Sequence, residues 1–244
     1  MKIARILKGA GIISSYGSMG AAAVTLIQDD LNVLVDTGHF GNRDVLLKRL
    51  SAEGIKPDEI DKIVLTHINW DHCLNVDLFQ NASIVLSKKE FVNGSLSGRG
   101  DFITTYYRNY LSSRHIVIAE DNTPVTRHSY ILMTPGHTPG HISLIVDDGE
   151  NNIIFSGDSI PNLRSYRRGL PDFIFYSKEE AISSILRIKK LNPSMIIPGH
   201  DPPFNEGGYL ENDIIDIILR NEDETNSIIK FNKDRAGGPV EFYE

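Results

Sequence analysis

Short apolar runs that are soon followed by a histidine or an aspartate constrain this chain more than any other feature of its sequence. Four such runs contain three or four residues each and are rich in isoleucine. Runs of this length, bounded by polar residues, are typical of buried strands. The histidines and aspartates that follow them lie at positions 67–72, 137, 158 and 200. Because rigid strands commonly carry functional loops at their ends, we expect these four ends to meet at one edge of a sheet.

The rest of the chain mixes strands with helices. Strands are predicted at 24–27, 32–35, 63–65, 84–86, 116–118, 130–133, 142–146, 153–155 and 195–197. Helices are predicted at 44–50, at 181–191 behind a capping box of Ser177 and Glu180, and over a long terminal stretch at 209–231. Residues 93–114 lack a clean period, which indicates a loop and a short helix lying over a site. The tail at 232–244 is expected to be loosely held.

The composition is that of a globular protein without a large basic surface. Of the 244 residues, 41% are hydrophobic and 23% are charged, so we expect one domain over 1–244 with a sizeable core. The net charge of -7 argues against a nucleic-acid partner, which usually needs a clustered basic face. No run of 18 apolar residues is present, so we expect no contact with a membrane. Cys73 is the only cysteine, which excludes an intrachain disulfide and fits a cytoplasmic protein.

The residue types at the four strand ends are those that bind transition metals. Imidazole and carboxylate groups are common ligands of zinc, iron and manganese in proteins. A single histidine or aspartate would as readily serve packing or a turn, whereas a convergent set is hard to explain without a metal. The members of this set are His67, Asp71, His72, His137, Asp158 and His200.

In this arrangement the chain resembles the metallo-β-lactamase-fold hydrolase superfamily, in particular its small stand-alone, lactonase-like and glyoxalase II-like members. The pattern of that superfamily is His-x-His-x-Asp-His, here at 67–72, followed by a histidine after a strand, a bridging aspartate and a final histidine. The resemblance extends from Asp36-Thr37-Gly38 to Pro198-Gly199-His200. It implies an α+β fold, an αββα sandwich of two mixed β-sheets flanked by helices.

The resemblance also implies how the ligands divide between one or two divalent transition metals, with zinc expected first and iron or manganese as alternatives. His67 and His137 would hold the first metal, Asp71, His72 and His200 would hold the second, and Asp158 would bridge both. Asn69 departs from the pattern, because it stands where the second histidine is expected. An amide oxygen is a weaker zinc ligand than imidazole. Asn69 could therefore ligate through its oxygen, leave only the second metal tightly bound, or shift the preference to iron or manganese.

The implied function is a metal-dependent hydrolase that uses a metal-activated water on an ester, thioester, lactone or phosphoester. Asp71 would be the catalytic residue that orients the water and shuttles its proton. One alternative is a small RNA-directed phosphodiesterase, which the acidic balance and the missing nuclease-specific domain disfavour. Another is a di-iron redox or metal-binding protein of the same fold, whose usual flavodoxin-like domain has no room here. A non-catalytic binder would be separable by its metal content.

Three further residues are weighed with the predicted ligands. His141 is expected close to the site without ligating, as a support for the ligands. Asp36 is expected to cap a turn or to contact a ligand histidine. Trp70 is expected to pack beneath the metal-binding loop.

A basic cluster after Asp158 provides the candidate substrate-binding residues, namely Arg164, Tyr166, Arg167 and Arg168. Arginine can grip a carboxylate or phosphate with two parallel hydrogen bonds, so the cluster predicts an anionic small-molecule substrate; a solvated turn is the alternative. Pro161 occupies the position at which lactonase-like relatives carry a tyrosine. A homodimer is left open.

Overall fold

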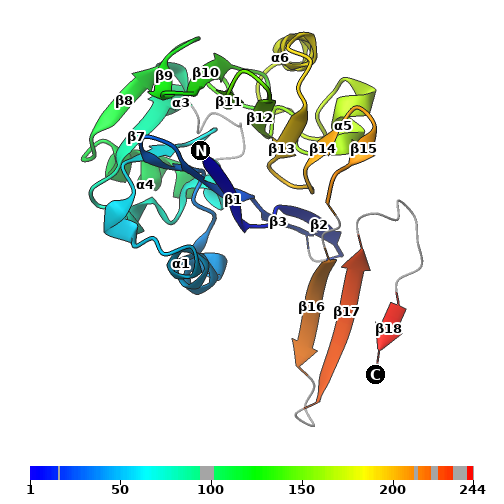
Figure 1. Cartoon of the computed structure of the whole chain (residues 1–244). Helices are drawn as coiled ribbons and strands as arrows, with labels where there is room; N and C mark the ends of the chain where they lie inside the picture. The colour runs from blue at the N-terminus through cyan, green and yellow to red at the C-terminus, as the bar shows by residue number, and fades with distance from the viewer. Residues whose placement is uncertain (16, 94–101, 212–213, 221–224, 233–240, 244) are drawn as a thin grey trace.

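Two mixed β-sheets lie face to face with helices on their outer sides (Figure 1). The computed structural model describes residues 1–244 except 16, 94–101, 212–213, 221–224, 233–240 and 244. The predicted αββα sandwich is confirmed.

The first sheet has six strands in the order β1-β4-β5-β6-β7-β8. Their bounds are β1 Lys2–Leu7, β4 Val24–Gln28, β5 Asn32–Val35, β6 Lys62–Val64, β7 Ser83–Ser87 and β8 Ile116–Ala119. Strands β4 and β5 pair in antiparallel fashion, and β5 through β8 run parallel. The helices on this side are α1 Arg43–Ala52, α3 Lys88–Asn93 and α4 Phe102–Leu111.

The second sheet has seven strands in the order β15-β14-β13-β12-β11-β10-β9. Their bounds are β9 Pro124–Thr126, β10 Ser129–Met133, β11 Ile142–Asp147, β12 Asn152–Gly157, β13 Met195–Pro198, β14 Phe204–Asn205 and β15 Gly208–Tyr209. Strands β12 and β13 pair in parallel. The helices on this side are α5 Leu163–Arg168 and α6 Lys178–Lys190. Ser177 accepts a hydrogen bond from the Glu180 N–H and so begins α6 at the predicted cap.

Short helical turns complete the chain between the strands. They are η1 Phe40–Asn42, η2 Pro57–Glu59, α2 Trp70–Cys73 and η3 Val76–Leu78. Every helix among the described residues is too short or too polar to cross a lipid bilayer.

Alternation along the strands divides the core into layers. In the first sheet, Leu26 and Ile63 pack toward α1 and α4, while Ile27 and Val64 pack toward the second sheet. Successive side chains of a strand point to opposite faces, so a strand that is apolar at every position is buried on both sides. The short apolar runs of the sequence are therefore interior strands, and their polar ends project from the edge of the sandwich.

The predicted terminal helix over 209–231 is wrong. Two antiparallel strands, β16 Ile214–Arg220 and β17 Asn226–Asn232, occupy most of this stretch, and β18 Glu241–Tyr243 pairs with β17. Isoleucine is branched at Cβ and fits a pleated strand better than a helix, and this segment contains many isoleucines. The three strands extend away from the two main sheets (Figure 1). Residues 233–240 of the tail that was expected to be loosely held lie outside the described residues.

The helix predicted within residues 93–114 is present, but it does not lie over the site. Residues 94–101 lie outside the described part, and the ten-residue helix α4 follows them. Tyr107 and Leu111 of α4 are buried in the core against the first sheet. No described residue of 93–114 lines the cavity at the strand ends. A hairpin near the N-terminus, β2 Ala10–Ser14 and β3 Gly17–Ala21, lines the cavity instead, and its strands were not among those predicted.

Candidate metal centre

Loops at four strand ends bring the predicted ligands together at one edge of the sandwich. His67 follows β6, and Asp71 and His72 lie on α2 directly afterwards. His137 follows β10. Asp158 and His200 follow the parallel neighbours β12 and β13, whose carboxyl ends meet at the same edge.

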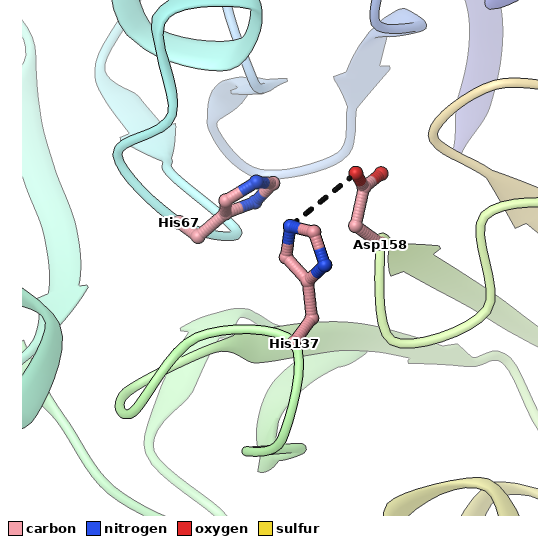
Figure 2. Close-up of side chains that lie close together, drawn as sticks. All are labelled: His67, His137 and Asp158. Carbon is pink, nitrogen blue, oxygen red and sulfur yellow. Dashed lines mark ion pairs between the residues drawn. The ribbon is translucent and has the colours of Figure 1, made fainter. Parts of the chain in front are cut away.

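The six side chains form two clusters. His67, His137 and Asp158 make the first cluster, and Asp71, His72 and His200 make the second; within each, ligand atoms lie within 4.8 Å of one another. Figure 2 shows the first cluster, with the three side chains pointing toward one another.

Asp158 faces both clusters with different oxygens. Its Oδ2 lies 3.5 Å from Nε2 of His137, in the first cluster. Its Oδ1 lies 3.2 Å from Nε2 of His200 and 3.5 Å from Nε2 of His72, in the second cluster. One carboxylate could therefore contact two metal ions at once, as the resemblance implied.

Three of the candidate ligand histidines are held by one ring nitrogen and present the other to the centre. Nδ1 of His72 lies 2.8 Å from Oδ2 of Asp36. Nδ1 of His137 lies 2.8 Å from the Phe173 carbonyl oxygen, and Nδ1 of His200 lies 3.2 Å from the Ala21 carbonyl oxygen. Because these oxygens can only accept hydrogen bonds, the proton is assigned to Nδ1, and the Nε2 lone pair is left free to bind a metal.

Buried polar atoms without a protein partner mark the centre of the site. Nε2 of His67, Nε2 of His72 and Oδ1 of Asp158 are buried and have no hydrogen-bond partner among the described residues. Leaving such groups unpaired in a protein interior is costly. Nitrogen and carboxylate donors in this arrangement fit a pair of divalent transition metals.

The charges around the clusters favour a cation. Burial and the neighbouring His72 and His137 imidazoles hold the pKa of His67 well below its usual value, so His67 is neutral and can act as a ligand. Burial opposes ionisation of Asp158, but the His200, His72 and His137 rings hold the pKa of Asp158 well below its usual value. Burial also opposes charge on His72, but the Asp36, Asp158 and Asp71 carboxylates raise the pKa of His72 to about 10. Carboxylates therefore dominate the second cluster.

Asn69 lies beside the first cluster. Its amide nitrogen is 3.2 Å from Nε2 of His137, where an amide N–H would donate to the lone pair that a metal needs. The amide would have to turn to offer its oxygen instead. The first cluster thus offers two imidazoles and the shared Asp158 carboxylate. The second cluster offers two imidazoles, the Asp71 carboxylate and the shared Asp158 carboxylate, which is one strong candidate ligand more.

His141 and Asp36 lie where they can support the ligands. Nε2 of His141 accepts the backbone N–H of Asp158 at 3.0 Å, and Nδ1 lies 2.9 Å from Thr134 Oγ1. Both ring nitrogens are therefore engaged away from a metal. Asp36 accepts hydrogen bonds from His72 and from Thr66, whose Oγ1 lies 3.0 Å from Nδ1 of His67.

Sequence reasoning missed Glu90, a fully buried carboxylate that joins two ligand loops. It accepts hydrogen bonds from the Ile68 N–H at 3.2 Å, the Thr138 hydroxyl at 2.7 Å and the Gly140 N–H at 3.0 Å. Ile68 adjoins His67, and Thr138 adjoins His137. A glutamate after two lysines reads as an exposed helix start, so no local signal could have identified it.

A cavity of about 390 Å³ lies over the two clusters. Trp70 lines it and is 36% exposed, so it does not pack beneath the loop as predicted. The hairpin β2–β3 contributes Gly11 and Gly20. A Cβ at Gly20 would lie 2.9 Å from Asp71 Oδ2, so a larger residue there would crowd the second cluster.

The predicted basic cluster does not gather at the cavity. Of its four residues only Arg164 is among the lining residues, and its guanidinium is 2.7 Å from Asp172 Oδ2. Arg168 is 3.0 Å from the same carboxylate. Tyr166 packs its ring against Phe204, and Arg167 lies in the last turn of α5 and does not line the cavity.

Comparison with known proteins agrees with this geometry. Residues 18–200 match the family model of the Metallo-beta-lactamase superfamily. The chain belongs to this superfamily. It is 31% identical over 191 residues to metallo-beta-lactamase domain-containing protein 1 of Xenopus laevis, which covers 75% of this chain and 71% of that protein. The predicted family is confirmed, and the protein is a hydrolase of this superfamily.

Lactonases are among its other relatives. The chain is 26% identical over 162 residues to an N-acyl homoserine lactonase of Bacillus thuringiensis, covering 65% of this chain and 62% of that enzyme. The solved structure of a dizinc quorum-quenching lactonase, AidC, superposes with a TM-score of 0.61 at 20% identity, over 93% of this chain and 79% of that one.

We expect Asp158→Ala to remove metal from both clusters and to abolish activity, because it takes away the carboxylate that faces both. His141→Ala should lower metal affinity or rate by about 10–100-fold, as is usual for a group that only orients a ligand. Elemental analysis and rate measurements on both variants test this. Equal losses of metal and of rate in the two variants would contradict the assignment.

We expect the two metal positions to differ in affinity, with the position beside His67 and His137 the weaker. Asn69→His should tighten that position by adding an imidazole, whereas Asn69→Ala should not. Calorimetric titration of the metal-free proteins with zinc measures both affinities. Two equal sites in the parent, unchanged by Asn69→His, would refute the expectation.

We expect Glu90→Gln to lower the free energy of unfolding by about 1–3 kcal/mol, because the new amide N–H₂ faces a donor and leaves a buried group unpaired. Urea unfolding measures the change. The exposed Glu120 offers a matched control, since Glu120→Gln should alter the free energy by less than about 0.5 kcal/mol. Identical stabilities of the two variants would show that Glu90 does not join the loops.

Proposed function

We propose that this protein hydrolyses a lactone or another uncharged carboxylic ester at a centre of two divalent metal ions, zinc before iron or manganese. The observation that carries the proposal is the pair of His/Asp clusters that share Asp158 beneath one cavity. The lactonase relatives support this choice of substrate, and the dizinc lactonase of the same fold supports the choice of metal.

The proposed ligands are those of the two clusters. His67, His137 and one oxygen of Asp158 would hold the first ion, with Asn69 as a weak additional ligand. Asp71, His72, His200 and the other oxygen of Asp158 would hold the second. Bound divalent ions supply a Lewis acid that polarises the substrate oxygen, and they lower the pKa of water toward neutrality.

Asp71 is the proposed proton carrier. Its carboxylate lines the cavity, is 7% exposed, and places Oδ2 3.5 Å from Nε2 of His200. From this position Asp71 can accept a hydrogen bond from the attacking water, take its proton, and later return the proton to the leaving oxygen. Asp36 and the Phe173 carbonyl fix the orientation of His72 and His137 while this proton moves.

The charges at the cavity favour a neutral ester over a phosphodiester. Among the described lining residues Arg164 is the only lysine or arginine, and it is already paired with Asp172. Proteins that bind nucleic acid neutralise several phosphates with lysine and arginine. The RNA-directed phosphodiesterase is thus the less supported alternative, and no described residue favours the redox alternative.

The single domain over 1–244, the homodimer and the cytoplasmic location remain predictions. The family match ends at residue 200, before the strands β16–β18.

The test combines metal content with a substrate panel. Metal-replete protein should contain one to two transition-metal ions per chain, and a strong chelator should lower both its melting temperature and its rate, because a ligand of the folded state alone stabilises that state. Lactones and neutral esters should be hydrolysed faster than phosphodiesters, and zinc should restore the rate.

Three outcomes would contradict the proposal. Metal content well below one ion per chain would favour a non-catalytic binder. Faster cleavage of phosphodiesters would favour the nuclease alternative. A metal centre that changes oxidation state but hydrolyses no ester would favour the redox alternative.

A further inference from the structure

One wall of the cavity is aromatic. Phe173 and Phe175 both line it, with ring centroids 6.5 Å apart and ring planes inclined by only 13°. Phe173 is 50% exposed although it lies at a concave site. A large apolar side chain that lines a cavity and stays half-exposed is suited to contact with an apolar ligand group.

This wall is fixed to a candidate metal ligand. The Phe173 carbonyl accepts the Nδ1 hydrogen of His137, and the Phe175 N–H donates to the His137 carbonyl at 3.0 Å. The Phe175 ring packs against the His137 imidazole with centroids 5.0 Å apart. The segment therefore keeps a constant position relative to the first cluster, and a group resting on it would have a defined distance to the reacting bond.

The charged residues on one side of the cavity already pair with one another. Asp172 accepts hydrogen bonds from Asn162 at 2.6 Å, Arg164 at 2.7 Å and Arg168 at 3.0 Å. An anionic substrate would have to displace Asp172 from Arg164 before it could use that guanidinium. The arginine pair thus orders the segment before Phe173, and this role differs from the anion recognition that the sequence predicted.

We propose that Phe173 and Phe175 form the binding subsite for an uncharged apolar group next to the scissile ester, with an aryl group bound better than an alkyl group. This inference rests on the proposed function and adds the class of substrate. Aryl rings are favoured because offset or edge-to-face ring contacts add to the burial of apolar surface.

Binding can be measured without turnover. Trp70 is the only tryptophan of the chain and lines the cavity, so its fluorescence reports occupancy. Metal-loaded protein is titrated with four primary amides that resist hydrolysis, namely acetamide, cyclohexylacetamide, phenylacetamide and the anionic succinamate. We expect phenylacetamide to bind at least about ten-fold tighter than acetamide, cyclohexylacetamide to lie between them, and succinamate to bind no better than acetamide.

Variants assign the effect to the wall. Phe173→Ala should remove most of the affinity difference between phenylacetamide and acetamide. Phe173→Leu should remove only the affinity difference between phenylacetamide and cyclohexylacetamide. Tyr176 is a matched control, because it lies in the same segment, is 49% exposed and does not line the cavity. Tyr176→Ala should leave all four affinities unchanged. Asp172→Asn should release Arg164 and strengthen succinamate binding several-fold.

The corresponding ethyl esters connect binding to turnover. Phe173→Ala should raise KM for ethyl phenylacetate with little change in kcat, because the contact is present in both ground and transition states. The proposed subsite would be overturned if the parent bound succinamate as tightly as phenylacetamide. It would also be overturned if Phe173→Ala kept the preference for phenylacetamide over acetamide. The expected amide affinities without hydrolysis of any ester would instead overturn the proposed function and leave the subsite standing.

Discussion

The buried carboxylate of Asp36 connects the end of β5 to two candidate ligands, directly to His72 and through Thr66 to His67, and the geometry of the centre depends on it. It accepts the Thr66 N–H and hydroxyl and the Nδ1 hydrogen of His72. Its backbone has a φ of 58°, in the left-handed region that aspartate tolerates better than most residues. Burial raises the pKa of Asp36, and the hydrogen bonds from His72 and Thr66 oppose that rise. The strained turn after β5 thus orients imidazoles that belong to another loop.

A second buried carboxylate gives the other half of the frame. Glu90 binds the loop of His67 to the loop of His137, and Ser87 adds a hydrogen bond to the Gly140 carbonyl at 2.6 Å. Little space remains at this junction, since a Cβ on Gly140 would lie 2.0 Å from the Glu90 nitrogen. The sheets set the coarse positions of the ligands, and these two carboxylates set their mutual distances.

The predictable part of this protein is the part encoded by local pattern. Apolar runs with polar ends identified the interior strands, and the spacing of histidines and aspartates identified the side chains that the structure gathers into two clusters. Contacts between distant segments left no such pattern. Nothing near Glu90 in the sequence reveals that it faces residues 68 and 138–140, and nothing near Arg164 reveals that Asp172 pairs with it. In the terminal segment, the abundance of isoleucine favours the strands that form there over the predicted helix.

The order of the ligands along the chain has a mechanical consequence. The exposed turn at Asp148–Asn151 lies between β11 and β12 and divides the ligand set. His67 and His137 precede this turn in the first cluster, and Asp71 and His72 precede it in the second. Asp158 and His200 follow it, and each cluster has a ligand from both sides of the turn. The ions we propose would therefore act as cross-links between the part of the chain before this turn and the part after it, in a chain whose single cysteine offers no intrachain disulfide for that purpose.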